Sequence, residues 1–124
     1  MESILLVEDE DIIAQNMVIK LKKLGCKNTY TAKSGEQALR IIEEKHPDLI
    51  IVDIVLEGKM SGIELAQKVK NHNGIPVIFV TADSNEETIN KAKLTSSFGY
   101  IIKPFRDKDL KIAIDTALSK FIIE

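Results

Sequence analysis

A single carboxylate, Asp53, follows the apolar run LIIV (Leu49–Val52) in this chain of 124 residues. An unpaired carboxylate is costly to desolvate, so Asp53 is expected at the end of a buried strand rather than inside it. An aspartate in such a place can act as a nucleophile if nearby groups neutralise the charge of what it attacks. Its chemistry therefore depends on the residues that accompany it.

Polar residues also follow three other apolar runs. Glu8 and Asp9 follow ILLV, Thr81 follows VIFV, and Lys103 follows YII. If the first and third runs form neighbouring strands, Glu8, Asp9 and Asp53 converge and repel one another. A hard cation that prefers oxygen ligands, such as Mg²⁺, would relieve that repulsion. These groups suit phosphoryl transfer onto Asp53, with the metal and Lys103 neutralising charge and Thr81 bonding the product.

Each residue has a plainer interpretation when it is taken alone. An acid at a strand end is more often a helix cap or a solvated loop residue. We interpret Glu10 and Asp11 simply as acidic enrichment at a helix N-terminus. Thr81 can be an ordinary β-branched strand residue, and Lys103 can be a surface charge. What favours a site is that all these groups follow predicted strands, where open parallel sheets bind their ligands.

Apolar runs and helical patterns alternate along the chain. Strands are predicted at Ile4–Val7, Asn28–Ala32, Leu49–Val52, Val77–Val80 and Tyr100–Ile102. A helix follows each of them, and the one over about Asn85–Leu94 has a thin apolar face. This repetition predicts one α/β domain, a doubly wound five-stranded parallel sheet with helices on both faces. Ser34 and Gln37 predict a capping box, and Gly25 predicts a helix end.

The composition narrows the function classes. Hydrophobic residues make up 44% and charged residues 29%, as in ordinary globular proteins. With a net charge of -2, the chain has no excess of positive charge that would indicate binding to nucleic acid or to an anionic membrane surface. We expect no membrane span and no signal peptide. The single cysteine, Cys26, points to a small core hydrophobe in a reducing compartment, and we expect the cytoplasm.

At this point the motifs match a known family. The segments ILLVEDE, LIIVDI, SGIEL, PVIFVTA and GYIIKPF occur in this order. From Ser3 to Phe121 the chain resembles the receiver domain of bacterial and archaeal two-component response regulators. The resemblance implies one receiver domain over residues 1–124, with a flavodoxin-like (βα)5 fold and strand order 2-1-3-4-5. It also implies a signalling switch, not an enzyme that acts on foreign substrates.

The resemblance implies a phosphoacceptor role for Asp53. The phosphoryl group would come from a phosphohistidine on a sensor histidine kinase or on a phosphotransfer protein of a phosphorelay. Glu8 and Asp9 would organise Mg²⁺, with Asp9 as a direct ligand and Glu8 acting largely through water. Asp53 itself and the backbone carbonyl of Val55 would complete the protein ligands.

The same resemblance implies the parts of a switch. Thr81 would move toward the phosphoryl group, and Lys103 would pair with it. The Lys103–Pro104 peptide bond is expected to be cis. The ring of Tyr100 would turn inward when Thr81 moves, although Tyr100 can equally be an ordinary edge-strand tyrosine. Ala82 is small and leaves room beside the phosphoryl group.

The readout is expected on the face built by residues Ser84–Phe121. Phosphorylation would bias a two-state equilibrium there, and the thin apolar face of the helix over about Asn85–Leu94 fits an element that shifts at low cost. This face is also a candidate interface for a phosphorylation-dependent homodimer. An output partner or output domain would bind this face.

Two features depart from the family pattern. The segment from Asp53 to Gly62 lacks the proline that the family usually carries after the acceptor. Val55 and Asp83 occupy the positions that tune phosphoryl lifetime. Because an apolar Val55 cannot position an attacking water by hydrogen bonding, we hypothesise a fairly long-lived phosphoryl state.

The sequence disfavours three rival functions. A metal-dependent phosphohydrolase with an aspartyl nucleophile usually carries a second acid where this chain has Val55. A receiver-like interaction module that has lost phosphorylation would lack site residues, and none is missing. A nucleotide-binding domain would carry a glycine-rich loop after ILLV, which is absent from the sequence.

Overall fold

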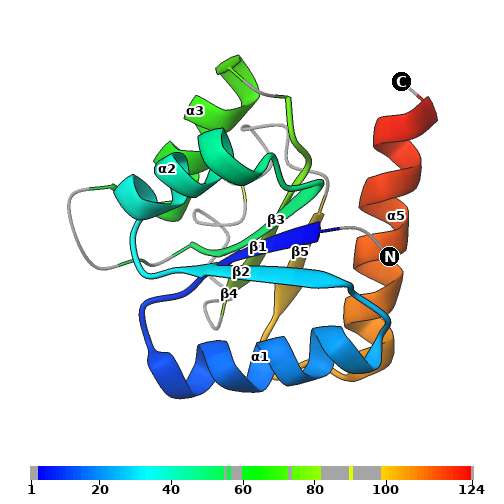
Figure 1. Cartoon of the computed structure of the whole chain (residues 1–124). Coiled ribbons are helices and arrows are strands. Elements are labelled where there is room, and N and C mark those ends of the chain that lie inside the picture. The colour runs from blue at the N-terminus through cyan, green and yellow to red at the C-terminus, as the bar shows by residue number, and fades with distance from the viewer. Residues whose placement is uncertain are drawn as a thin grey trace.

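A computed structural model describes residues 3–54, 56, 60–72, 74–81, 90 and 99–123 of the chain. Its strands form one parallel sheet (Figure 1). The strands are β1 (Ser3–Val7), β2 (Asn28–Ala32), β3 (Leu49–Asp53), β4 (Val77–Thr81) and β5 (Gly99–Ile102). Their order is β2-β1-β3-β4-β5, as the family resemblance implied.

Helices cover both faces of this sheet. The described helices are α1 (Asp11–Lys23), α2 (Gly35–Lys45), α3 (Gly62–His72) and α5 (Asp107–Ile123). Helices α1 and α5 lie on one face, and α2 and α3 lie on the other (Figure 1). The predicted doubly wound α/β fold is therefore confirmed. The helix predicted over about Asn85–Leu94 lies outside the described residues.

The core consists of two apolar layers separated by the sheet. Successive side chains of a strand point to opposite faces. Ile4 and Leu6 therefore join the layer under α1 and α5, whereas Leu5 and Val7 join the layer under α2 and α3. Because both faces are covered, β1 and β3 can be apolar at consecutive positions. This explains the uninterrupted runs that the sequence shows.

Local signals fix several helix ends. The Ser34 hydroxyl accepts a hydrogen bond from the Gln37 backbone N–H at 3.2 Å, as predicted. The Gln37 side-chain oxygen accepts from Lys33 N–H at 2.8 Å, one residue before the partner that a capping box would use. Gly25 follows the end of α1 with φ of 96°, which favours glycine. Cys26 is buried, as expected.

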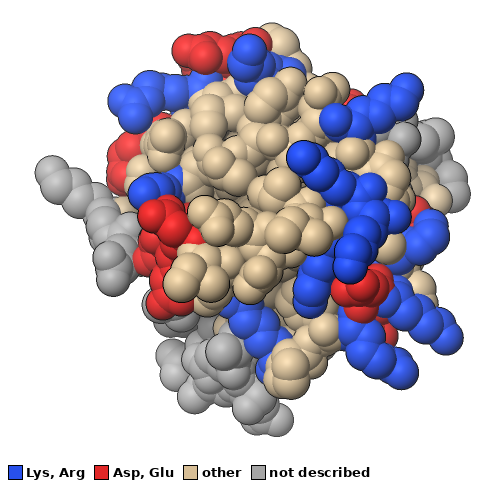
Figure 2. Space-filling model, turned by 60° about the horizontal axis from the view of Figure 1, so that its bottom comes forward, with Lys and Arg blue, Asp and Glu red and all other residues tan. Residues whose placement is uncertain are grey.

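Charge is separated along α1. Asp11 lies in the first turn of the helix, and Lys20, Lys22 and Lys23 lie in the last. Figure 2, which brings this side of the molecule forward, shows the largest group of basic side chains on the right, with acidic and basic side chains both present on the left. The charge separation along α1 complements the helix dipole. None of the helices described here is long and apolar enough to cross a bilayer.

Candidate functional site

The strand register brings the predicted site residues to one edge of the sheet. Val7 pairs with Val52 across β1 and β3, so Glu8 and Asp53 are the next residues of neighbouring strands. Asp53 pairs with Val80 across β3 and β4, and Thr81 is next. β1 lies between β2 and β3, where the strand order reverses. Open α/β sheets bind ligands at this switch point.

Lys103 joins two of the carboxylates. Its Nζ atom lies 3.3 Å from Asp53 Oδ2 and 3.6 Å from Glu8 Oε1. The Lys103 backbone N–H donates to the Thr81 carbonyl at 2.8 Å, which continues the β4–β5 pairing up to the site. The Lys103–Pro104 peptide bond is cis, as predicted. The ammonium therefore reaches the site from the end of β5.

Glu8 is the buried member of the acidic pair, with 6% of its surface exposed. The pKa of its carboxyl group is raised to about 7, mainly by burial and next by a hydrogen bond with the Asp9 side chain. The negative charge of Asp53 acts in the same direction, while the Glu10 N–H and Lys103 oppose it. Burial and the two neighbouring acids thus favour the protonated form of Glu8 up to about neutral pH.

This excess of acid fits a divalent cation. A cation can take the place of the proton shared by Glu8 and Asp9, and all the available donors are oxygens. Within the described residues, no three His, Cys, Asp or Glu side chains gather closely enough to hold a metal ion by themselves. Mg²⁺ tolerates this arrangement because it usually keeps several waters. Val55, whose carbonyl was predicted as a ligand, lies outside the described residues.

The start of α3 packs against the end of β3. Gly62 N–H donates to the Ile54 carbonyl at 3.1 Å. A Cβ atom at position 62 would overlap the Asp53 carbonyl oxygen, so this position requires glycine. Ser61 and Glu64 form a capping box, with Glu64 N–H donating to the Ser61 hydroxyl at 3.1 Å. This cap was not predicted, although the Ser-x-x-Glu pattern is its signal in the sequence.

The two predicted switch residues occupy different environments. Thr81 is 1% exposed at the end of β4. Tyr100 is 39% exposed, and it pairs with Phe79 across β4 and β5. The ring of Tyr100 therefore lies partly in solvent in this structure. Ala82 and Asp83, which were assigned roles beside the phosphoryl group, lie outside the described residues.

The family assignment follows from comparison with known proteins. The family model of the response regulator receiver domain matches residues 4–115. The chain belongs to this family. It is a receiver domain of the response regulators of two-component systems, and such domains are signalling switches.

Curated receiver-containing proteins match nearly the whole chain. The transcriptional regulatory protein PdtaR of Mycobacterium tuberculosis is 30% identical over 118 residues, which are 95% of this chain and 57% of that protein. The heme response regulator HssR of Staphylococcus aureus is 33% identical over 118 residues, 95% of this chain and 52% of that protein. The receiver domain thus spans about half the length of these relatives.

Solved receiver structures are similar over their full length. The signal receiver domain of a modulated diguanylate cyclase from Desulfovibrio desulfuricans has a TM-score of 0.92 at 32% identity, covering 99% of this chain and 98% of that one. A receiver domain protein from Clostridium thermocellum has a TM-score of 0.91 at 29% identity, covering 99% and 98%.

Proposed function

We propose that Asp53 of this receiver domain accepts a phosphoryl group from a phosphohistidine on a sensor histidine kinase or a phosphotransfer protein. The observation that supports this most is the contact between the Lys103 ammonium and the Asp53 carboxylate, at 3.3 Å. An Asp53 oxygen forms the new bond to phosphorus, and the bond from phosphorus to the histidine nitrogen breaks. Lys103 balances the charge on the transferred group.

The remaining site residues have supporting roles in this proposal. Glu8, Asp9, Asp53 and the Val55 carbonyl hold Mg²⁺, directly or through water. When bound, Mg²⁺ supplies positive charge beside the oxygens of the transferred group. The raised pKa of Glu8 supports this assignment, because burial and the neighbouring Asp9 and Asp53 disfavour its charged form and a bound cation would offset that cost.

The proposed response to phosphorylation is a conformational change. The Thr81 hydroxyl donates a hydrogen bond to the phosphoryl group, and the Tyr100 ring then turns inward. This shifts the equilibrium of the 84–121 face and so its binding of an output partner, or of a second copy of the chain. The domain acts only on its own aspartate, which excludes turnover of foreign substrates. We place the domain, taken as residues 1–124, in the cytoplasm.

Intact mass spectrometry tests the acceptor. Wild type, Asp53→Asn and the control Asp115→Asn are incubated with acetyl phosphate, with Mg²⁺ or with EDTA. Asp115 is an exposed α5 residue whose side chain pairs with Lys111. A single phosphoryl adduct is expected on wild type and on the control, only with Mg²⁺. An unmodified wild type that is still folded would instead favour a pure interaction module.

A further inference from the structure

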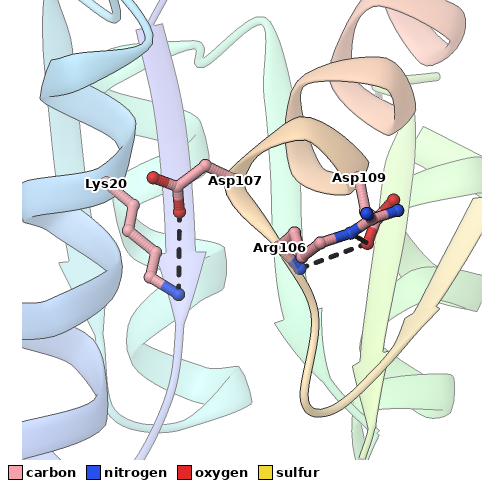
Figure 3. Close-up of polar contacts among 4 residues, drawn as sticks. All are labelled: Lys20, Arg106, Asp107 and Asp109. Atoms are coloured by element: carbon pink, nitrogen blue, oxygen red, sulfur yellow. Dashed lines mark hydrogen bonds and ion pairs between the residues drawn. The ribbon is translucent and has the colours of Figure 1, made fainter.

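Lys103 lies at the start of the turn that joins β5 to α5. The other end of this turn contacts helix α1. The Lys20 Nζ atom in α1 lies 3.8 Å from Asp107 Oδ1 (Figure 3). The same atom lies 4.9 Å from the centre of the Phe105 ring. One lysine thus contacts the turn two and four residues after Lys103, by an ion pair and by a cation–π contact.

The polar bonds described for Arg106, which lies between Phe105 and Asp107, are local. Arg106 donates to Asp109 Oδ2 from its backbone N–H at 3.1 Å and from its Nε at 3.5 Å (Figure 3). These bonds close the first turn of α5 on itself and do not tie it to another element. Buried Leu110 fixes α5 only from a point further along the chain. Lys20 therefore supplies a charged link from the turn to a separate element.

The Lys20 contacts connect α1 and the turn beside a groove that lies between them. A groove of about 280 Å³ separates them, and both Lys20 and Lys103 line it, together with Met17, Pro104 and Phe105. Lys20 lines this groove and reaches Asp107, while the Lys103 ammonium contacts the Glu8 and Asp53 carboxylates. Without the Lys20 contacts, Phe105 would keep its packing against the core, but among the described residues the turn beyond Lys103 would lose its charged link to α1.

We propose that Lys20 is a positioning residue for phosphorylation, because it fixes Phe105 and Asp107 and so holds the Lys103 ammonium at Asp53. This inference rests on the proposed phosphoacceptor function. The contacts of Lys20 are partly exposed, with 37% of its side chain in solvent, so each one is weak. The expected effect is therefore a change of about three- to tenfold in rate rather than a loss of reaction.

The test measures the rate of adduct formation with acetyl phosphate, which removes any effect on a protein donor. Lys20→Met keeps the stem and removes the charge, and its rate should fall about three- to tenfold. Lys20→Arg keeps both contacts and should stay within about twofold of wild type. Lys22→Met is the matched control, because Lys22 is an exposed lysine of the same helix turn. Equal rates for Lys20→Met and wild type would overturn the proposal.

Two further readouts separate positioning from general stability. In a Lys103→Met background, Lys20→Met should cause no additional loss, since it acts through Lys103; an additive loss would contradict this. In metal-free protein with ¹³C-labelled lysine, Lys20→Met should shift the ε-methylene signal of Lys103, and Lys22→Met should not. If wild type takes no phosphoryl group, the proposed phosphoacceptor function is wrong. If the Lys103 signal is also unshifted in Lys20→Met, the proposed positioning of Lys103 by Lys20 is wrong as well.

Discussion

The Lys103 ammonium lies 3.3 Å from the Asp53 carboxylate although the two residues are 50 positions apart in the chain. Asp53 ends β3, and Lys103 follows β5, two strands away in the sheet. The pair is also partly buried, so its attraction is screened less than that of a surface pair. Lys103 is thus placed where charge would build up during phosphoryl transfer.

Replacing Lys103 by methionine should slow adduct formation by at least ~100-fold, as losing one such charge-stabilising group does elsewhere. Affinity for Mg²⁺ should not weaken, because removal of a cation leaves Glu8 and Asp53 more attractive to a metal. Calorimetric Mg²⁺ titration and acetyl phosphate labelling measure the two effects separately. Lys108→Met, an exposed lysine in the first turn of α5, is the control. Weaker Mg²⁺ binding together with slow labelling would point to a general collapse of the site.

Glu8 should make the metal-free protein less stable as the pH rises. Its pKa is raised from 4.5 to about 7 in the folded protein, mainly by burial. Between these values the folded state binds more protons than the unfolded chain, so the free energy of unfolding falls with rising pH. This stabilisation is fully present below about pH 4.5 and is lost as the pH rises through about 7.

Urea unfolding in EDTA from about pH 5 to about pH 8 measures this dependence. Glu8→Gln cannot titrate, so its free energy of unfolding should lack the decline that wild type shows. The difference between the two curves isolates Glu8 from the other acids of the protein. Parallel curves would mean that Glu8 titrates near its ordinary pKa.

Gly62→Ala should destabilise the protein by about 1–3 kcal/mol, although alanine normally stabilises a helix by about 0.5–1 kcal/mol over glycine. The sign reverses because the new methyl group meets the Asp53 carbonyl oxygen. Gly99→Ala is the control, since a Cβ atom there meets nothing within 4 Å. Thermal or urea unfolding measures the stability of both variants. A stabilised Gly62→Ala would disprove the close approach of α3 to β3.

Thr81→Val should separate phosphorylation from the switch. The variant should still take a phosphoryl group, because Asp53 and Lys103 remain, but Tyr100 should no longer change environment. The chain has two tyrosines and no tryptophan, so in a Tyr30→Phe background fluorescence reports on Tyr100 alone. Thr81→Ser keeps the hydroxyl and should retain the response. A full response in Thr81→Val would assign the coupling to another group.

The elements were predictable from the sequence because their patterns are local. The run before Asp53 and the pair Ser34 and Gln37 each need only a few neighbouring residues to be recognised. The assembly of the site depended on strand order, which came from the family motifs. Once that order is given, parallel pairing alone brings Glu8, Asp53 and Thr81 to one edge.

Other features depend on distances that no local pattern encodes. Nothing around Lys20 in sequence points to Phe105 or Asp107, because the contact arises only when α1 and α5 share a sheet face. The burial of Glu8 relative to Asp9 follows from its place directly after β1, and its pKa follows from that burial. The tight approach of Gly62 to Asp53 is likewise set by how α3 meets the sheet.

The order of the site residues along the chain has a consequence during synthesis. Glu8, Asp53 and Thr81 leave the ribosome well before Lys103, which belongs to the last segment added to the sheet. Until Lys103 emerges, Asp53 lacks the ammonium that lies 3.3 Å from it in the finished fold. If Asp53 is the acceptor, as proposed, a nascent chain carries it before the charge that supports its reaction, and full competence to receive a signal arrives only with β5 and α5.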